Sequence, residues 1–170
     1  VVTPLFPKRD PVAAYVTLDE ALAGGLTVRE VDESGSVPEL VVENPLDARV
    51  LLYDGEELVG AKQNRILNVS VLAEATSRLT IPVSCVEQGR WSRRSAHFGS
   101  GGHVSNVQLR MRKAEAQAAQ PLARGVSQSE VWDAVEAKAA RMHVASPTGA
   151  NADAFRSRAP DLRRLEQEFP

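Results

Sequence analysis

The sequence predicts an α+β fold, in which an antiparallel β-sandwich or barrel-like sheet in the N-terminal half is followed by three or four helices. Strand-like runs rich in β-branched residues recur at short intervals over the first 86 residues, as sandwiches and barrels require. Most helix-start signals come after residue 104. Because 170 residues suit one hydrophobic core, we expect a single domain over 1–170, with a β-rich core at 12–88, a basic glycine-rich loop at 89–104 and a helical part at 105–169.

The first expected element is a short helix over 17–22. Thr17 can cap it, Glu20 stands where a capping box needs an acid, and Gly24 can end it. We expect strands next at 26–31, 39–44 and 49–53, with a turn at 32–36. Asp54-Gly55 follows an apolar run and precedes another, which predicts a tight hairpin because both residues tolerate positive φ angles.

A second antiparallel pair is expected from the runs 66–72 and 79–86, which a short polar linker separates. The indices of antiparallel partners have a nearly constant sum. Residues near 64 and 65 should therefore lie opposite residues near 87 and 88. Two polar clusters would then share one end of the sheet.

The C-terminal half predicts amphipathic helices. One should begin at Ser105, with Gln108 completing its capping box, and another at Ser127, with Glu130 in that role. A break at 147–149 should precede one or two further helices within 150–169. The expected buried stripes are Val107, Met111, Ala114 and Ala118 on the first helix, and Trp132, Val135, Ala139 and Met142 on the second.

Composition excludes several classes of protein. Hydrophobic residues make up 43% and charged residues 25%, which is ordinary for a folded globular protein and not for a disordered one. No apolar run approaches the roughly 20 residues that span a bilayer. A single cysteine cannot form an intramolecular disulfide and fits a reducing, cytoplasmic setting. The start without methionine fits a trimmed piece of a longer protein.

Charge and side-chain chemistry point to an anionic partner. Residues 90–113 contain six Arg or Lys, two histidines and no acid, a field that attracts anions. Arginine binds phosphate with two parallel bonds, amides read base or ribose edges, and tryptophan offers a stacking face. The candidate ligand-binding residues are Lys62, Gln63, Asn64, Arg65, Gln88, Arg90 and Trp91. The same amides and guanidinium groups could instead satisfy backbone groups where strands end.

Two carboxylates are the catalytic candidates. Glu87 or Glu57 would activate water, while Arg65 and Arg90 hold the charge that develops on phosphate. Glu56 and Glu57 are neighbours in a strand and point to opposite faces, so only one of them can face a site. No metal ligand set is assigned, and the sequence specifies no cofactor.

Three other arrangements stay open as alternatives. Cys85 could be a thiol nucleophile with His97 and Glu87, although a cysteine on a strand face with Ile81 is more often a small buried hydrophobe. Zinc on Cys85, His97 and His103 matches no metal-site spacing. The loop 99–102, leading into a helix at Ser105, could cradle an anion, but it lacks the Gly-Lys-Ser/Thr ending of a P-loop.

Two strings carry a family resemblance: Gly55-Glu-Glu-Leu-Val-Gly-Ala-Lys-Gln-Asn-Arg65 and Pro82-Val-Ser-Cys-Val-Glu-Gln-Gly-Arg-Trp91. They resemble the domain family associated with ARG (ADP-ribosylglycohydrolase) and rhodanese-phosphatase-superfamily proteins. That association implies a place in systems that handle ADP-ribose or NAD-derived nucleotides, beside partner proteins of such systems. The family has no settled activity, so the resemblance assigns no catalytic residue.

The leading hypothesis is a domain that binds, and by extension processes, an anionic nucleotide-type ligand such as ADP-ribose or an RNA end. The site would lie where residues 56–65 meet residues 84–91, with the basic loop as a cover. The alternative is a noncatalytic β-sandwich adaptor, whose polar clusters are structural and whose helices dock a partner protein.

Overall fold

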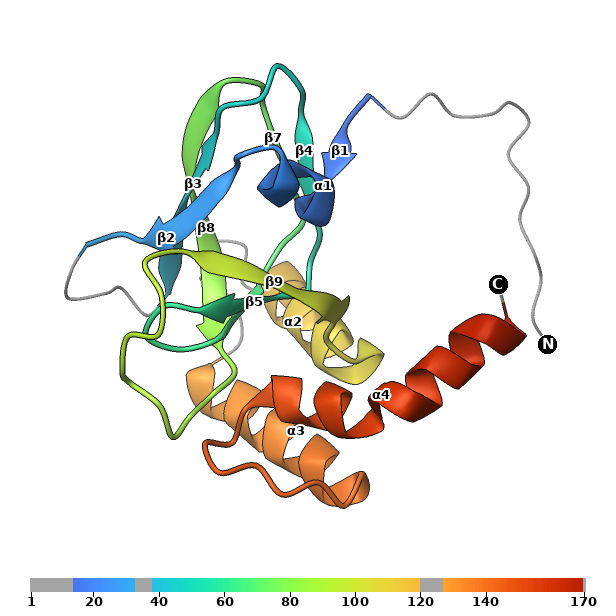
Figure 1. Cartoon of the computed structure of the whole chain (residues 1–170). Coiled ribbons are helices and arrows are strands. Elements are labelled where there is room, and N and C mark those ends of the chain that lie inside the picture. The colour runs from blue at the N-terminus through green and yellow to red at the C-terminus, as the bar shows by residue number, and fades with distance from the viewer. Residues whose placement is uncertain (1–13, 33–37, 120–126, 170) are drawn as a thin grey trace.

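The fold is α+β, as the sequence predicted. The computed structural model describes residues 14–32, 38–119 and 127–169 (Figure 1). A curled, half-barrel sheet of six antiparallel strands has the order β2-β3-β8-β6-β5-β9, and a smaller sheet has the order β1-β4-β7. The strands are β1 (Val16–Thr17), β2 (Thr27–Glu30), β3 (Glu39–Asn44), β4 (Val50–Leu52), β5 (Glu56–Gly60), β6 (Arg65–Leu67), β7 (Val71–Ala73), β8 (Ser77–Cys85) and β9 (Phe98–Val104).

Helices cover one side and one end of this sheet (Figure 1). They are α1 (Leu18–Ala23), α2 (Val107–Ala119), α3 (Gln128–Arg141) and α4 (Asn151–Glu168). None of the helices in the described ranges is long and apolar enough to cross a membrane.

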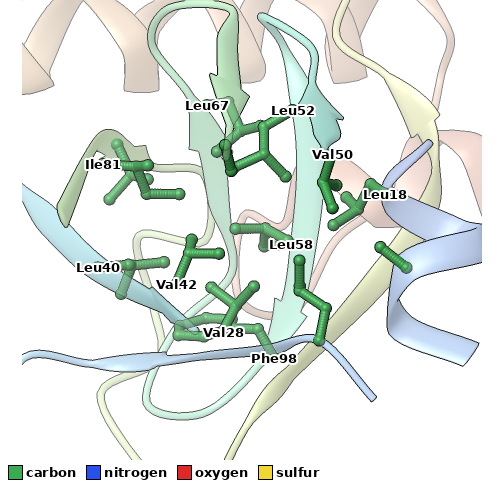
Figure 2. Close-up of a cluster of buried hydrophobic side chains, with 14 of the residues drawn as sticks. Leu18, Val28, Leu40, Val42, Val50, Leu52, Leu58, Leu67, Ile81 and Phe98 are labelled. Atoms are coloured by element: carbon green, nitrogen blue, oxygen red, sulfur yellow. The ribbon is translucent and has the colours of Figure 1, made fainter. Parts of the chain in front are cut away.

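Two hydrophobic clusters hold the layers together. The larger fills the concave side of the curled sheet, where leucine and valine side chains from both sheets meet α1 (Figure 2). The smaller lies on the opposite face and packs the sheet against α2 and α3; it consists of Ile66, Val86, Leu109, Val131 and Val135. Strand alternation explains the division, since Leu67 and Val83 face the larger cluster while Ile66 and Val86 face the helices.

Capping signals located the two helices that carry a complete capping box. Thr17 caps α1 and Ser127 caps α3, each with the reciprocal glutamate bond. The second predicted strand pair is confirmed for residues 65–67 and 83–85 only, because Val71–Ala73, which overlaps the predicted strand 66–72, forms β7 and pairs with β4. Arg65 pairs with Cys85 and Leu67 with Val83, an index sum of 150 that brings residues 62–65 to the segment after Cys85.

The predicted hairpin at Asp54-Gly55 is wrong, although a turn is present there. Gly55 has φ +83°, and the amide of Glu56 bonds to the carbonyl of Tyr53 at 3.1 Å. The strands on either side do not pair, because β4 joins β7 in the small sheet and β5 joins β6 and β9 in the large one. A turn sequence fixes a local bend, whereas burial of apolar faces chooses the partner strands.

The basic loop at 89–104 is shorter than predicted, because Phe98–Val104 forms strand β9 and pairs with β5. Glycine has low strand propensity, which hid this strand. The next helix is capped by Asn106, whose side chain accepts from the Leu109 amide at 2.9 Å, and not by Ser105. Its predicted stripe is also wrong, since Val107 and Met111 are 63% and 56% exposed and Leu109 is buried.

The C-terminal predictions hold in outline. A turn at 147–149 precedes one continuous helix, α4, which contains Pro160. On α3 the buried residues are Val131, Val135 and Lys138, so the predicted stripe was one residue out of phase at its start. The predicted turn at 32–36 falls mostly outside the described residues.

Asp54 should prove essential to the docking of α2. Its carboxylate bonds to the ammonium group of Lys113 at 3.0 Å, and Lys113 is buried and also donates to the Leu67 carbonyl. Asp54→Ala should lower the free energy of unfolding by about 3–5 kcal/mol, because it leaves a buried charge unpaired. In the double variant Asp54→Ala/Lys113→Met the loss should be clearly smaller. Urea denaturation measures both, and an equal loss in the two proteins would contradict this account.

Candidate functional site

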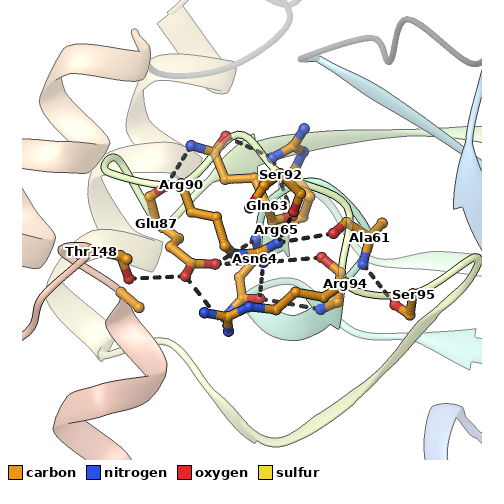
Figure 3. Close-up of polar contacts among 12 residues, drawn as sticks. Ala61, Gln63, Asn64, Arg65, Glu87, Arg90, Ser92, Arg94, Ser95 and Thr148 are labelled. Carbon is orange, nitrogen blue, oxygen red and sulfur yellow. Dashed lines mark hydrogen bonds and ion pairs between the residues drawn. The ribbon is translucent and has the colours of Figure 1, made fainter.

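The two predicted polar segments lie side by side at one end of the sheet (Figure 3). The Asn64 amide donates to Glu87 Oε2 at 3.2 Å, and the Gln63 side chain donates to the Glu87 carbonyl. Arg90 Nη2 donates to Asn64 Oδ1 at 3.1 Å. Strand pairing between β6 and β8 produces this convergence, because it holds the chain on either side of the pair in register.

Glu87 is buried, and donors occupy its carboxylate. Arg90 Nη2 lies 2.6 Å from Oε2, and Thr148 Oγ1 donates to Oε1 at 2.9 Å. Burial alone would raise the pKa of Glu87, but the bonds from Arg90, Thr148 and the Asn64 amide outweigh it and lower the pKa. A carboxylate that stays ionised with its lone pairs engaged is poorly suited to accept a proton from water.

The two predicted phosphate-binding arginines are also buried in internal bonds. Arg90 donates to the carbonyls of Gly60, Ala61 and Ser92. Arg65 is fully buried, and its Nη1 donates to Gln63 Oε1 at 2.9 Å. Arg90 therefore cross-links the chain where strands end, whereas Arg65 bonds to the nearby Gln63 and lies 3.9 Å from Glu30 of β2.

The remaining predicted ligand-binding residues differ in exposure. Gln63 and Asn64 are buried, Lys62 is half-buried and Gln88 is exposed. Trp91 is 50% exposed, and its ring centroid lies 5.7 Å from Lys62 Nζ and 5.6 Å from Arg65 Cζ. Among these residues only Asn64 lines the neighbouring cavity described next.

A cavity of about 580 Å³ lies between β5, β9 and α4. Aliphatic side chains and glycines form most of its wall, and Arg94 and Arg156 supply positive charge. These two arginines are 58% and 70% exposed, although Arg156 is bonded to Asp153 at 2.5 Å. The lining residues that carry the argument are Asn64, Arg94, His103, Phe155, Arg156 and Leu162.

A carboxylate and histidine pair stands at the wall of this cavity. His103 Nε2 lies 2.7 Å from Glu57 Oε2, and Glu57 is fully buried behind it. Asn151 Nδ2 bonds to the same oxygen at 2.5 Å, and Asn64 Nδ2 bonds to Oε1 at 3.3 Å. Asn64 thereby joins this pair to the Arg90–Glu87 cluster, because its Oδ1 accepts from Arg90.

Residues of α3 and α4 complete the surroundings of His103. The Phe155 ring stacks on the imidazole with centroids 3.7 Å apart, and Lys138 Nζ lies 3.6 Å from the Phe155 centroid. Lys138 Nζ also donates to Asn151 Oδ1 at 3.0 Å. Burial lowers the pKa of Lys138 to about 8, against the opposing charge of Glu57.

The glycines of β9 let the chain approach this pair closely. A Cβ on Gly101 would lie 3.0 Å from the Glu57 carbonyl oxygen and 3.0 Å from His103 Cε1. Glycine inside a strand often marks such a close approach of backbone. The glycines that suggested a loop in the sequence therefore allow β9 to pack closely against Glu57.

Sequence reasoning missed His103, Asn151, Lys138 and Phe155 as members of one cluster. Lys138 carried a usable signal, because it occupies the apolar stripe of α3 three residues after Val135, where a charge needs a buried partner. Asn151 stands at a helix start and looks like a cap, but the N-cap residue is Ala150 and the Asn151 side chain bonds to Glu57.

The three alternative sites find little support in this geometry. Cys85 is buried, and burial raises the pKa of its thiol, the opposite of what a nucleophile needs. No group of three or more potential metal ligands occurs among the residues that the structure describes. The segment 99–102 belongs to β9 and does not lead directly into a helix N-terminus.

Lys138 should titrate near pH 8 in the folded protein. An unfolded chain keeps a lysine proton to about pH 10.4, so the folded state loses its proton first and this group should make the protein more stable as pH rises from about 8 to 10. The ¹³Cε shift of Lys138, assigned by its loss in Lys138→Met, would report the midpoint. A midpoint above pH 10 would contradict the burial of the ammonium group.

Comparison with known proteins places the chain in a family and leaves its activity open. No curated protein and no solved structure matches it. One family model does, over residues 1–170, which is the whole chain. The chain therefore belongs to the family described as ARG and Rhodanese-Phosphatase-superfamily-associated Protein domain.

Proposed function

We propose that this domain binds an anionic nucleotide-type ligand, such as ADP-ribose, an NAD-derived nucleotide or an RNA end, in the cavity between β5, β9 and α4. The observation that carries the proposal is that Arg94, Arg156, His103 and Asn64 line one partly apolar cavity. Guanidinium groups suit phosphate oxygens, and imidazole and amide groups suit ribose hydroxyls. A pocket of a few hundred Å³ with few polar groups is typical of small-ligand sites.

The proposed site is displaced from the one expected from the sequence. Glu87 and Arg90 support it from behind, because their internal bonds fix the loop that carries Arg94. Arg94 donates its backbone amide to the Ala61 carbonyl at 2.8 Å and places its side chain 4.0 Å from Glu87. A cytoplasmic setting and partner proteins that handle ADP-ribose belong to the same proposal.

A noncatalytic adaptor is the second candidate function, and two observations favour it. Both oxygens of the Glu87 carboxylate and both terminal nitrogens of Arg90 are bonded within the protein, as they would be in a purely structural cluster. Apolar side chains on α2 and α4 are exposed, among them Val107, Met111 and Leu165. Adjacent exposed apolar groups are a feature of docking surfaces.

A thermal-shift titration separates the two functions. ADP-ribose, NAD and a short single-stranded RNA are the probes, with inorganic phosphate as the minimal anion. A ligand at 100 times its Kd stabilises the native state by about 2.7 kcal/mol, so the melting temperature should rise by several degrees. Failure of every nucleotide to raise it at millimolar concentration would favour the adaptor.

The arginines should determine the affinity. Arg94→Ala and Arg156→Ala should each weaken binding of the successful probe about tenfold or more and reduce its dependence on salt, because each removes a charge from the cavity wall. Arg164→Ala is the matched control, since Arg164 is exposed on α4 and does not line the cavity. Equal affinities for the three variants would place the ligand elsewhere.

A further inference from the structure

We propose that His103 is the general base of a hydrolytic site, that Glu57 positions it, and that the substrate class is a phosphate ester or anhydride of a single nucleotide. This inference rests on the proposed function, because it uses the same cavity. It adds a reaction and assigns it to a residue that the sequence singled out only for a zinc site. The geometry of the buried carboxylate carries the argument.

Glu57 is surrounded by donors. The two asparagine amides, Asn64 Nδ2 and Asn151 Nδ2, each donate to its carboxylate. The third partner is His103 Nε2 at 2.7 Å. A fully buried carboxylate is stable only when its partners donate, so the ring proton of neutral His103 belongs on Nε2.

The other ring nitrogen, Nδ1, is then the acceptor. It makes no hydrogen bond to another described residue, while the ring lines the cavity. Stacking of Phe155 at 3.7 Å fixes the plane of the ring, and Lys138 holds Asn151. A histidine with one nitrogen held by a carboxylate and the other without a partner among the described residues, on a ring that lines a cavity, has the arrangement of a general base.

The rest of the cavity suits attack on phosphorus. Arg94 and Arg156 carry the positive charge that phosphate oxygens need as negative charge increases in the transition state. Ser100 also lines the cavity, but its hydroxyl accepts from the Gly102 amide at 3.0 Å and makes no bond to His103. Water is therefore the nucleophile in this proposal.

The reaction is a hydrolysis and needs no further reactant. His103 Nδ1 takes one proton from water as the water oxygen bonds to phosphorus. The bond from phosphorus to the leaving oxygen breaks with its electron pair. The leaving oxygen then takes the proton from the imidazolium, which returns the ring to its neutral state.

The experiment uses the full chain and two probes, ADP-ribose for the anhydride and adenosine 2′,3′-cyclic phosphate for the ester. ³¹P NMR follows cleavage, and the thermal shift follows binding. His103→Asn should bind the probe that is cleaved, with a rate at least about 100-fold lower, because a general base contributes roughly that factor or more. His97→Asn is the control, an exposed histidine outside this cavity, and should keep full activity.

Glu57→Gln tests the positioning role separately. It should lower kcat with little change in KM and shift the pH profile, because a glutamine can donate to Nε2 and move the ring proton to Nδ1. The ¹⁵N–¹H correlation pattern of the His103 ring reports the tautomer without any substrate. An Nδ1–H tautomer in the unmodified protein would overturn the proposal even where Glu57→Gln fails to fold.

The outcomes also separate this inference from the proposed function. Binding of either probe without cleavage would overturn the catalytic role and leave the binding function standing. Absence of binding by both probes, with no cleavage, would overturn this inference, whereas the proposed function would fall only if NAD and the short RNA also failed to bind. Cleavage that His103→Asn retains at full rate would leave hydrolysis in place and remove His103 from it.

Discussion

The burial of Glu57 is the constraint on which the rest of the structure depends. Its side chain has no exposure, and a buried carboxylate without donors costs several kcal/mol. Donors must therefore arrive from separate parts of the chain: Asn64 before β6, His103 in β9 and Asn151 at the start of α4. Meeting this requirement joins the sheet to the helical part and orients the imidazole at the cavity wall.

The cavity follows from the same connections. A backbone bridge between Glu87 and Ala150 and the bond from the Asn151 amide to the Val86 carbonyl, 2.8 Å, set the start of α4 against the end of β8. From there α4 runs alongside β5 and β9, where glycines leave room (Figure 1). Apolar packing of Val131 and Val135 against Ile66 and Val86 supports the arrangement on the same face of the sheet, because Ile66 is the cross-strand partner of Glu57. A polar cluster beside a cavity stabilises a fold less than an apolar interface would. Such a loss of stability is typical of functional sites.

Local signals in the sequence correctly predicted the features that depend on neighbouring residues, such as helix starts and the register of one strand pair. The capping boxes at Thr17 and Ser127 located α1 and α3, and the index sum of the β6–β8 pair brought Asn64 to Glu87. The prediction was less accurate wherever the position of a residue depends on a partner far away in the sequence. Asp54-Gly55 has the chemistry of a hairpin turn, yet Asp54 binds Lys113 of α2 and the flanking strands enter different sheets. Glu57 was found as a candidate, but its relation to Asn151, 94 residues away, depends on the docking of helices that strand periodicity does not specify.

Hydrogen exchange in Glu57→Gln tests most directly whether this buried carboxylate holds the helices and β9 together. We expect amides at the start of α4, near Asn151, and in β9, near His103, to exchange at least about tenfold faster than in the unmodified protein. Amides in the β3–β8 ladder, which β6 separates from Glu57 in β5, should keep their protection. Unchanged exchange at both places, or a uniform loss across the whole sheet, would contradict the claim that Glu57 is the specific junction.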